Sequence, residues 1–260
     1  MQNPERDEFF VGYDPPVPPR LARFVGRVVT GAGALALALA GVLAAGHVPL
    51  DGGTFEFGRP RPFSGTVVER PYPVVRLDAT EGTNAGASRA VLLVAPGKHG
   101  ADAVVGGLSG RHVTFTGTRV HRGAWEAIEI DPSSLVTGQA AAVAPVGAES
   151  PGRSTGSLVE LTGEIVDSKC FLGVMVPGAG KTHKDCASLC LRGGIPPAFH
   201  VQDRDGRSAL LLVTHPSGEP MRGPAVQMAG EALSVTGSVD RHEGWLVLRT
   251  DPESWHPVEQ

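Results

Sequence analysis

The longest apolar stretch of the chain runs from Val28 to Leu50, and its 23 residues include no Asp, Glu, Lys or Arg. At 1.5 Å per residue, a helix of this length covers the hydrocarbon core of a bilayer, which is about 30 Å thick. The stretch therefore predicts a transmembrane helix over residues 28–50, preceded by a cytoplasmic leader over residues 1–27.

The charges on either side of this stretch predict its orientation. Arg20, Arg23 and Arg27 precede it, whereas the acidic residues Asp51 and Glu56 follow it. Because basic flanks stay in the cytoplasm, we expect a single-pass protein of the cytoplasmic (inner) membrane whose C-terminal domains are extracytoplasmic, that is, periplasmic. A cleaved signal peptide is the alternative, since small residues precede His47, but the long, acidic leader favours an uncleaved anchor.

Beyond the apolar stretch, apolar and polar residues alternate in short runs, which is typical of β-strands with one buried face. Residues 63–69 and 161–167 are predicted to be first strands, and each contains an early glycine, Gly65 or Gly163, suited to a bulge or a close backbone approach. Similar alternation predicts further strands and turns; the strands are 113–116, 127–130, 233–236 and 246–248, and the hairpin turns are 120–123 and 240–244.

The region after the apolar stretch also contains an internal sequence repeat. Phe115-Thr116-Gly117 recurs as Val235-Thr236-Gly237, and Trp125 recurs as Trp245, both after 120 positions. Upstream, residues 90–94 match 209–213 at an offset of 119, and residues 64–69 match 162–167 at an offset of 98. This repetition predicts two copies of one module, with the two tryptophans in equivalent core positions.

Four or five short strands per copy predict the fold class. The chain is expected to be mainly β, with two tandem small OB-like β-barrels over residues 57–137 and 157–258, joined by an Ala-, Gly- and Pro-rich linker over 138–156. An SH3-like barrel or a β-sandwich is the alternative for each copy.

The second copy contains an insertion that the first copy lacks. Between matched positions, 21 residues separate Val68 from Ala90, whereas 42 separate Val166 from Ala209. The added residues fall within 168–197 and include all three cysteines of the chain. Since the first copy has no cysteine, we infer that the module folds without one and that the insertion has another role.

Local signals predict a short helix from His183 to Arg192 within this insertion. Thr182 and Asp185 have the spacing of a capping box, and Gly193-Gly194 forms a stop signal. At 100° per residue, His183, Cys186 and Cys190 lie on one helix face. Cys170, at the end of the preceding strand, can reach the same face.

This set predicts a metal site formed by Cys170, His183, Cys186 and Cys190. Three thiolates and one imidazole suit tetrahedral zinc, and Cu(I) accepts the same donors. Asp167, Met175 and His200 are candidate additional ligands. A structural disulfide is the second interpretation, because exported thiols usually oxidise, and a redox-active or cofactor-attaching cysteine is the third.

The charge composition argues against one class of function, the binding of nucleic acid. A net charge of −4 and an isoelectric point near 6.1 provide no basic surface for nucleic acid. No catalytic residues are predicted, and we expect a non-enzymatic accessory protein that binds metal or takes part in electron transfer for a membrane-bound redox or metal-handling complex. The alternative is a structural or interaction protein with a disulfide-stapled insertion and no metal, and an enzyme that uses a reactive cysteine is the third hypothesis.

The sequence in and around the insertion also resembles a known sequence signature. Residues 163–170, 183–190 and 193–196 resemble the signature of uncharacterised exported bacterial proteins, G-E-[IV]-V-D-x2-C, H-x2-C-x3-C and G-G-x-P. The resemblance implies export but no particular activity. Cys186 and Cys190 also loosely resemble the copper-binding cysteines of cytochrome oxidase assembly factors and of the binuclear copper centre of the oxidase, although the histidine that those families place four residues after the second cysteine is absent.

Overall fold

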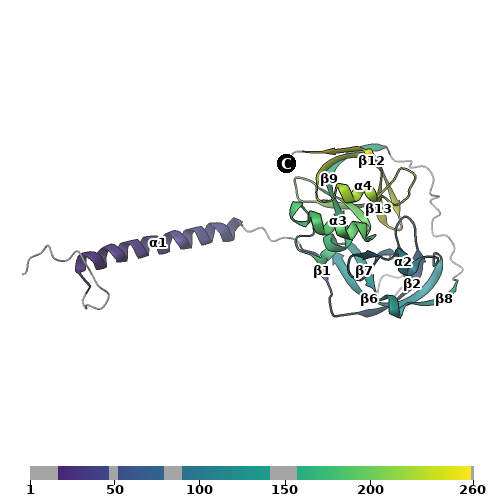
Figure 1. The fold of residues 1–260 in the computed structure, drawn as a ribbon, viewed down its shortest axis with the longest axis horizontal. Coiled ribbons are helices and arrows are strands. Elements are labelled where there is room, and N and C mark those ends of the chain that lie inside the picture. The colour runs from purple at the N-terminus through teal and green to yellow at the C-terminus, as the bar shows by residue number, and fades with distance from the viewer. Residues whose placement is uncertain (1–16, 47–51, 79–89, 141–156, 259–260) are drawn as a thin grey trace, which may run out of the picture. The chain divides into compact units, whose positions relative to one another are not determined.

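The structure is a computed structural model that describes residues 17–46, 52–78, 90–140 and 157–258 (Figure 1). The chain divides into two compact units, residues 1–50 and 51–260. The described part of the first unit is a single helix, and that of the second unit is mainly β-strands. The predicted mainly β class with an N-terminal apolar helix is therefore confirmed.

The helix of the first unit, α1 (Pro19–Gly46), has 28 residues and is long and apolar enough to cross a membrane. A signal sequence near the N-terminus meets the same criterion. The helix begins at Pro19 rather than at Val28, because proline is favoured in the first helical turn and arginine propagates a helix well. Residues 47–50 of the predicted span and 1–16 of the predicted leader lie outside the described residues.

The first half of the second unit is an eight-stranded sheet, here called the first sheet. Its strands are β1 (Thr54–Phe55), β2 (Arg61–Val68), β3 (Val74–Leu77), β4 (Ala90–Ala95), β5 (His99–Gly100), β6 (Arg111–Arg122), β7 (Trp125–Ile130) and β8 (Val136–Ala140). Two short helical segments accompany them, α2 (Asp102–Val105) and the 3-10 turn η1 (Pro132–Ser134). Most of the predicted linker, residues 141–156, lies outside the described residues.

The second half is a closed five-stranded barrel. Its strands are β9 (Leu158–Asp167), β10 (Pro197–Gln202), β11 (Ser208–Thr214), β12 (Ala232–His242) and β13 (Trp245–Pro257). Four helical segments accompany it: the π-helical turn η2 (Cys170–Val174), the 3-10 turn η3 (Lys181–His183), α3 (Lys184–Arg192) and α4 (Gly223–Gln227). In Figure 1, α3 lies between the barrel strands and strands of the first sheet. The barrel predicted for the second copy is confirmed.

Five strand pairings of the barrel have counterparts within the first sheet, with β2, β3, β4, β6 and β7 in the places of β9, β10, β11, β12 and β13. The registers match as well. Leu92 pairs with Ala127 across the parallel pair β4–β7, and Leu212 pairs with Val247 across β11–β13, 120 positions later on both strands. The sequence match at an offset of 119 is therefore one residue out of structural register.

The small barrel predicted for the first copy is wrong, because that copy forms the larger eight-stranded sheet. Strand β6 is 12 residues long and pairs with β1, β2, β7 and β8. Strand β5 is added to the other side through β4. Strand β8 pairs with β6 where the end of β13 pairs with β12, since Val113 faces Thr137 and Leu233 faces Pro257, 120 positions later on both strands. Strand β1 pairs with β6 beyond the residues that β2 contacts.

The predicted close approach at the two first-strand glycines is confirmed. A Cβ atom on Gly65 would lie 2.2 Å from the carbonyl oxygen of Arg76, and one on Gly163 would lie 2.3 Å from that of His200. Only glycine leaves room for a neighbouring backbone at such distances.

One apolar core joins the first sheet to the barrel. It contains Tyr72 and Leu92 from the first sheet, and Phe171 and Leu210 from the barrel half. Trp245 is buried in this core, and Trp125 packs against its edge with its ring 6.3 Å from that of Phe171. The two tryptophans therefore contribute to packing, as predicted.

Each half also inserts one polar side chain into the other. Tyr72, between β2 and β3, donates its hydroxyl hydrogen to the carbonyl of Val213 at 2.6 Å and accepts the N–H of Met221 at 2.9 Å. Lys169, between β9 and β10, donates to the carbonyls of Ala95 and Gly97, both at 2.7 Å, and pairs with Glu129. The two anchors occupy equivalent places in the repeated strand order, and together they fix the halves to each other.

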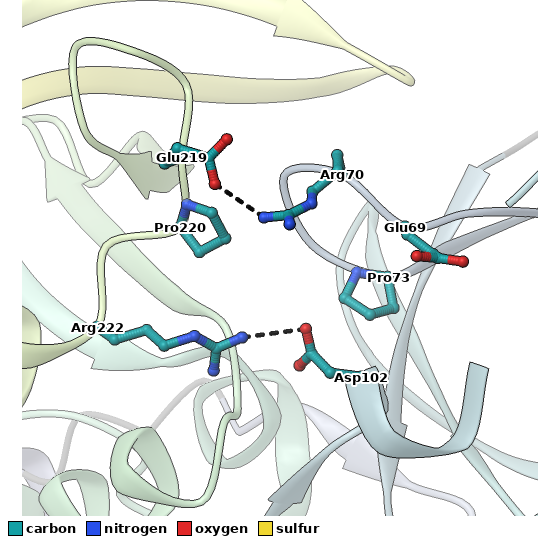
Figure 2. A pocket seen from close by; sticks show the side chains of 7 residues that line it. All are labelled: Glu69, Arg70, Pro73, Asp102, Glu219, Pro220 and Arg222. Atoms are coloured by element: carbon teal, nitrogen blue, oxygen red, sulfur yellow. Dashed lines mark hydrogen bonds and ion pairs between the residues drawn. The ribbon is translucent and has the colours of Figure 1, made fainter. Parts of the chain in front are cut away.

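A pocket of about 430 Å³ opens along the same junction (Figure 2). Two ion pairs cross it, Arg70 with Glu219 at 2.8 Å and Arg222 with Asp102 at 3.0 Å. Because these opposite charges pair with each other, we interpret the pocket as part of the junction between the halves.

Candidate metal centre

The first cysteine is positioned by an unusual turn directly after β9. The segment η2 is a π-helical turn, and it buries the side chain of Cys170. The carboxylate of Asp167, the last residue of β9, accepts the backbone N–H of Cys170 at 2.8 Å and so stabilises the start of the turn. Gly173 has a φ of 150°, which only glycine adopts easily, and it departs from helical geometry within the turn.

The helix that carries the other two cysteines is α3, and the prediction of its start needs correction. Residue His183, not Thr182, precedes the helix, and no side chain caps it. Gly180 begins the turn η3 with a φ of 80°, so Thr182 lies inside a helical turn rather than in the extended conformation of a capping residue. The predicted stop is confirmed, since Gly194 has a φ of 94°.

The structure brings the four predicted ligands together in two overlapping groups. The donor atoms of Cys170, His183 and Cys186 lie within 4.8 Å of one another, and so do those of Asp167, Cys170 and Cys190. Cys170 belongs to both groups and therefore connects them. Cys170, His183 and Cys190 are buried, whereas Cys186 is half-buried.

The distance between two of the sulfurs fits a tetrahedral metal ion. Cys170 Sγ and Cys190 Sγ are 3.9 Å apart. Two thiolates bound at about 2.3 Å to one tetrahedral ion are separated by about 3.8 Å, whereas a disulfide needs about 2.05 Å. All three cysteines are free thiols. The cluster can thus hold a metal ion without rearrangement of this sulfur pair.

Asp167 orients the histidine of the cluster. Its Oδ2 atom lies 3.0 Å from Nε2 of His183, and both side chains are buried. A carboxylate bonded to one ring nitrogen fixes the imidazole and leaves the other nitrogen, Nδ1, for a metal. Because Oδ1 already accepts the N–H of Cys170, both oxygens of Asp167 are engaged, and we assign it a supporting position rather than that of a ligand.

The two other candidate ligands are placed differently. His200 lies on β10 with its ring 4.6 Å from that of Phe171, and it belongs to neither metal-compatible group. Burial, together with the nearby charge of Arg122, lowers the pKa of His200 and keeps its ring neutral. Met175 directly follows η2, and 44% of its surface is exposed.

Sequence reasoning missed one member of the site, Lys98. Its Nζ atom lies 2.9 Å from Cys186 Sγ and 3.8 Å from Cys190 Sγ. Lys98 comes from the β4–β5 turn of the first sheet, which is held against the insertion by a hydrogen bond from Gly100 N–H to the carbonyl of Gly193 at 3.0 Å. No local pattern marks this lysine, because only packing between the halves brings it to the cysteines.

The thiols of the cluster differ in their readiness to ionise. The pKa of Cys190 is lowered by the hydrogen bond from Cys170, and the ammonium group of Lys98 adds to this effect. The same hydrogen bond, together with burial, raises the pKa of Cys170. Hydrogen bonding to Cys186 raises the pKa of Lys98. Of Cys170 and Cys190, Cys190 is therefore the thiol that first becomes a thiolate, the form that binds metals.

No protein-family model, curated protein or solved structure matches this chain. The chemistry of the site is therefore inferred from its own geometry.

Proposed function

We propose that this chain is a membrane-anchored accessory protein whose exported part binds zinc or Cu(I) through Cys170, His183, Cys186 and Cys190. The observation that carries the proposal is the 3.9 Å separation of the Cys170 and Cys190 sulfurs, beside a histidine held by a buried carboxylate. Three sulfurs and one imidazole nitrogen are the donors that these soft or borderline ions prefer.

The donor set favours a binding role over catalysis. Catalytic zinc sites keep one position for water or substrate, whereas four protein ligands fill a tetrahedral site. A protein with such a site would therefore store the metal, transfer it to a partner or, if the metal is copper, transfer electrons. Because Cys186 is only half-buried, a partner can approach the site at this residue. A membrane-bound redox or metal-handling complex is the kind of partner that fits these properties.

The same proposal includes the location and the fold relationship. Arg20, Arg23 and Arg27 lie in the first part of α1, and its last turn carries no basic residue, which supports an inner-membrane anchor with residues 52–260 in the periplasm. The matched registers support two related modules in tandem, of which the closed barrel is OB-like. The signature over 163–196 supports membership of an exported family.

Metal analysis of the purified full-length chain in detergent tests the proposal. After incubation with zinc or with Cu(I) under reducing conditions, we expect one tightly bound ion per chain. Cys190→Ser and His183→Ala should lose this ion, whereas His256→Ala, which removes a histidine outside both groups, should keep it. Absence of bound metal in the wild type, or full retention in Cys190→Ser, would overturn the proposal.

A second candidate function rests on the same sulfur pair. Cys170 and Cys190 need to approach by only about 2 Å to form a disulfide, which would staple the insertion and make the protein a structural or interaction module. Mass spectrometry of protein purified without reductant distinguishes the two functions. A loss of two hydrogens that links Cys170 to Cys190, with no bound metal, supports the second candidate.

A further inference from the structure

The first sheet places a positive charge on the sulfurs that the proposed metal site requires. Lys98 Nζ is within 2.9 Å of Cys186 Sγ and 3.8 Å of Cys190 Sγ. No other lysine is hydrogen-bonded to a cysteine in the part of the chain that the structure describes. The ammonium group therefore contacts two of the three sulfurs at once.

An ammonium group and a metal ion compete for this place. A metal bonded to Cys186 and Cys190 would sit about 2.3 Å from each sulfur. It would use the sulfur lone pairs that now accept hydrogen bonds from Lys98, and two cations this close repel each other in a partly buried site. Binding of a metal therefore requires Lys98 to move away from the sulfurs.

Lys98 is able to move without unfolding its turn. Its side chain is exposed and ends a flexible chain of four methylene groups. The backbone of the turn is fixed on both sides, because Gly97 accepts a hydrogen bond from Lys169 and Gly100 donates one to Gly193. The displacement can thus be confined to one side chain.

We propose that Lys98 is an internal competing cation that sets the metal affinity of the Cys/His cluster. The inference rests on the proposed metal-binding function and deepens it. Lys98 stabilises the metal-free thiolates and lowers the affinity for the incoming ion. A site with such a competitor suits a protein that passes its metal to a partner, because the ammonium group returns to the sulfurs as the metal leaves.

Competition titrations with a chromogenic chelator test this role on the full-length chain in detergent, using zinc and Cu(I) separately. Lys98→Met should bind the preferred ion roughly tenfold more tightly than the wild type, because the competing charge is gone. Lys184→Met is the matched control. It removes a lysine that precedes Cys186 by two residues but pairs with Glu231 instead of a sulfur, so its affinity should stay within about twofold of the wild type. Lys98→Arg keeps the charge and should not bind more tightly.

Each outcome decides the inference. Equal affinities of wild type and Lys98→Met overturn the role of Lys98 and leave the metal site intact. Weaker binding by Lys98→Met also overturns it, since Lys98 would then neutralise the metal–thiolate complex rather than compete with the metal. If neither wild type nor Lys98→Met binds metal, the proposed function fails, and the inference fails with it.

Discussion

The first sheet and the barrel share five strand pairings in one register, but they differ in the connection between the first two strands of that order. In the first sheet, residues 69–73 join β2 to β3, whereas in the barrel residues 168–196 join β9 to β10. The short connection carries Tyr72 into the barrel half, and the long one carries Lys169 into the first sheet. Both connections serve as anchors, and the longer one also holds the cysteines.

This difference shows that the chemistry belongs to the junction rather than to either strand scaffold. The barrel supplies Cys170, Cys186 and Cys190, and the first sheet supplies Lys98. The first sheet is therefore more than a second copy of the strand scaffold, because it contributes a residue to the site. The scaffold repeats, whereas the site arises where the two halves meet.

The largest effect is expected when the anchor of the barrel half is broken. Lys169→Met removes a buried ammonium group and leaves Glu129 without this partner and two carbonyls without their donor, which should destabilise the chain by about 3 to 5 kcal/mol. Urea denaturation of the full chain measures the change. Arg207→Met, at an exposed pair with Asp203, is the control and should change stability by less than about 0.5 kcal/mol. Comparable values for the two variants would contradict the anchor role.

The glycine pair tests whether the two halves are equivalent. Gly65→Ala and Gly163→Ala should each destabilise by about 2 to 3 kcal/mol, because the new methyl group meets a backbone carbonyl in both places. Gly223→Ala, where an added methyl group meets nothing within 4 Å, should be neutral or slightly stabilising. The three stabilities are measured by the same urea titration. If only one of the two substitutions lowers the stability strongly, the two glycines are not structurally equivalent.

The anchor of the first sheet should matter less than that of the barrel half. Tyr72→Phe keeps the buried ring and removes the hydroxyl that bonds to Val213 and Met221, so a loss of about 1 to 2 kcal/mol is expected. Thermal unfolding followed by circular dichroism measures it. If Tyr72→Phe costs as much as Lys169→Met, neutral and charged anchors contribute equally, contrary to this expectation.

The smallest effect should come from an ion pair at the rim of the junction, and it should depend on pH. Arg76 on β3 donates to Glu243 in the β12–β13 turn, with Nε 2.6 Å from Oε2, and this bond lowers the pKa of Glu243. A lowered pKa in the folded state contributes stability above the unfolded value near 4.5, and that contribution is lost as the pH falls through the folded value. Glu243→Gln should therefore cost about 1 kcal/mol at pH 7 and nothing in strong acid. If the loss of stability in Glu243→Gln does not depend on pH, it comes from the conformation of the β12–β13 turn and not from the ion pair.

Sequence patterns predicted the features that depend on local spacing. The strand alternation, the glycines at Gly65 and Gly163, and the short helix that carries Cys186 and Cys190 follow from neighbours a few residues apart. Thr182 was predicted as a cap because its spacing from Asp185 is right, but the turn begun by Gly180 alters its backbone conformation.

Features that depend on distant segments were not predictable in this way. Lys98 reaches Cys186 across 88 positions of sequence, and Lys169 reaches Ala95 across 74. Strand β1 joins the first sheet by pairing Thr54 with His121, 67 positions away, and no local pattern indicates this pairing.

The close backbone contact of Gly100 with Gly193–Gly194 has a consequence for how the protein can be divided. An added methyl group on Gly100 would lie 2.1 Å from the Gly194 carbonyl oxygen, and one on Gly193 would lie 1.7 Å from that of Lys98. Main-chain contact of this kind, combined with the reciprocal anchors, gives two separately produced polypeptides a surface for reassembly. Cutting the chain between residues 141 and 156 should therefore yield complementary pieces that associate spontaneously. Neither piece alone would contain every group of the site.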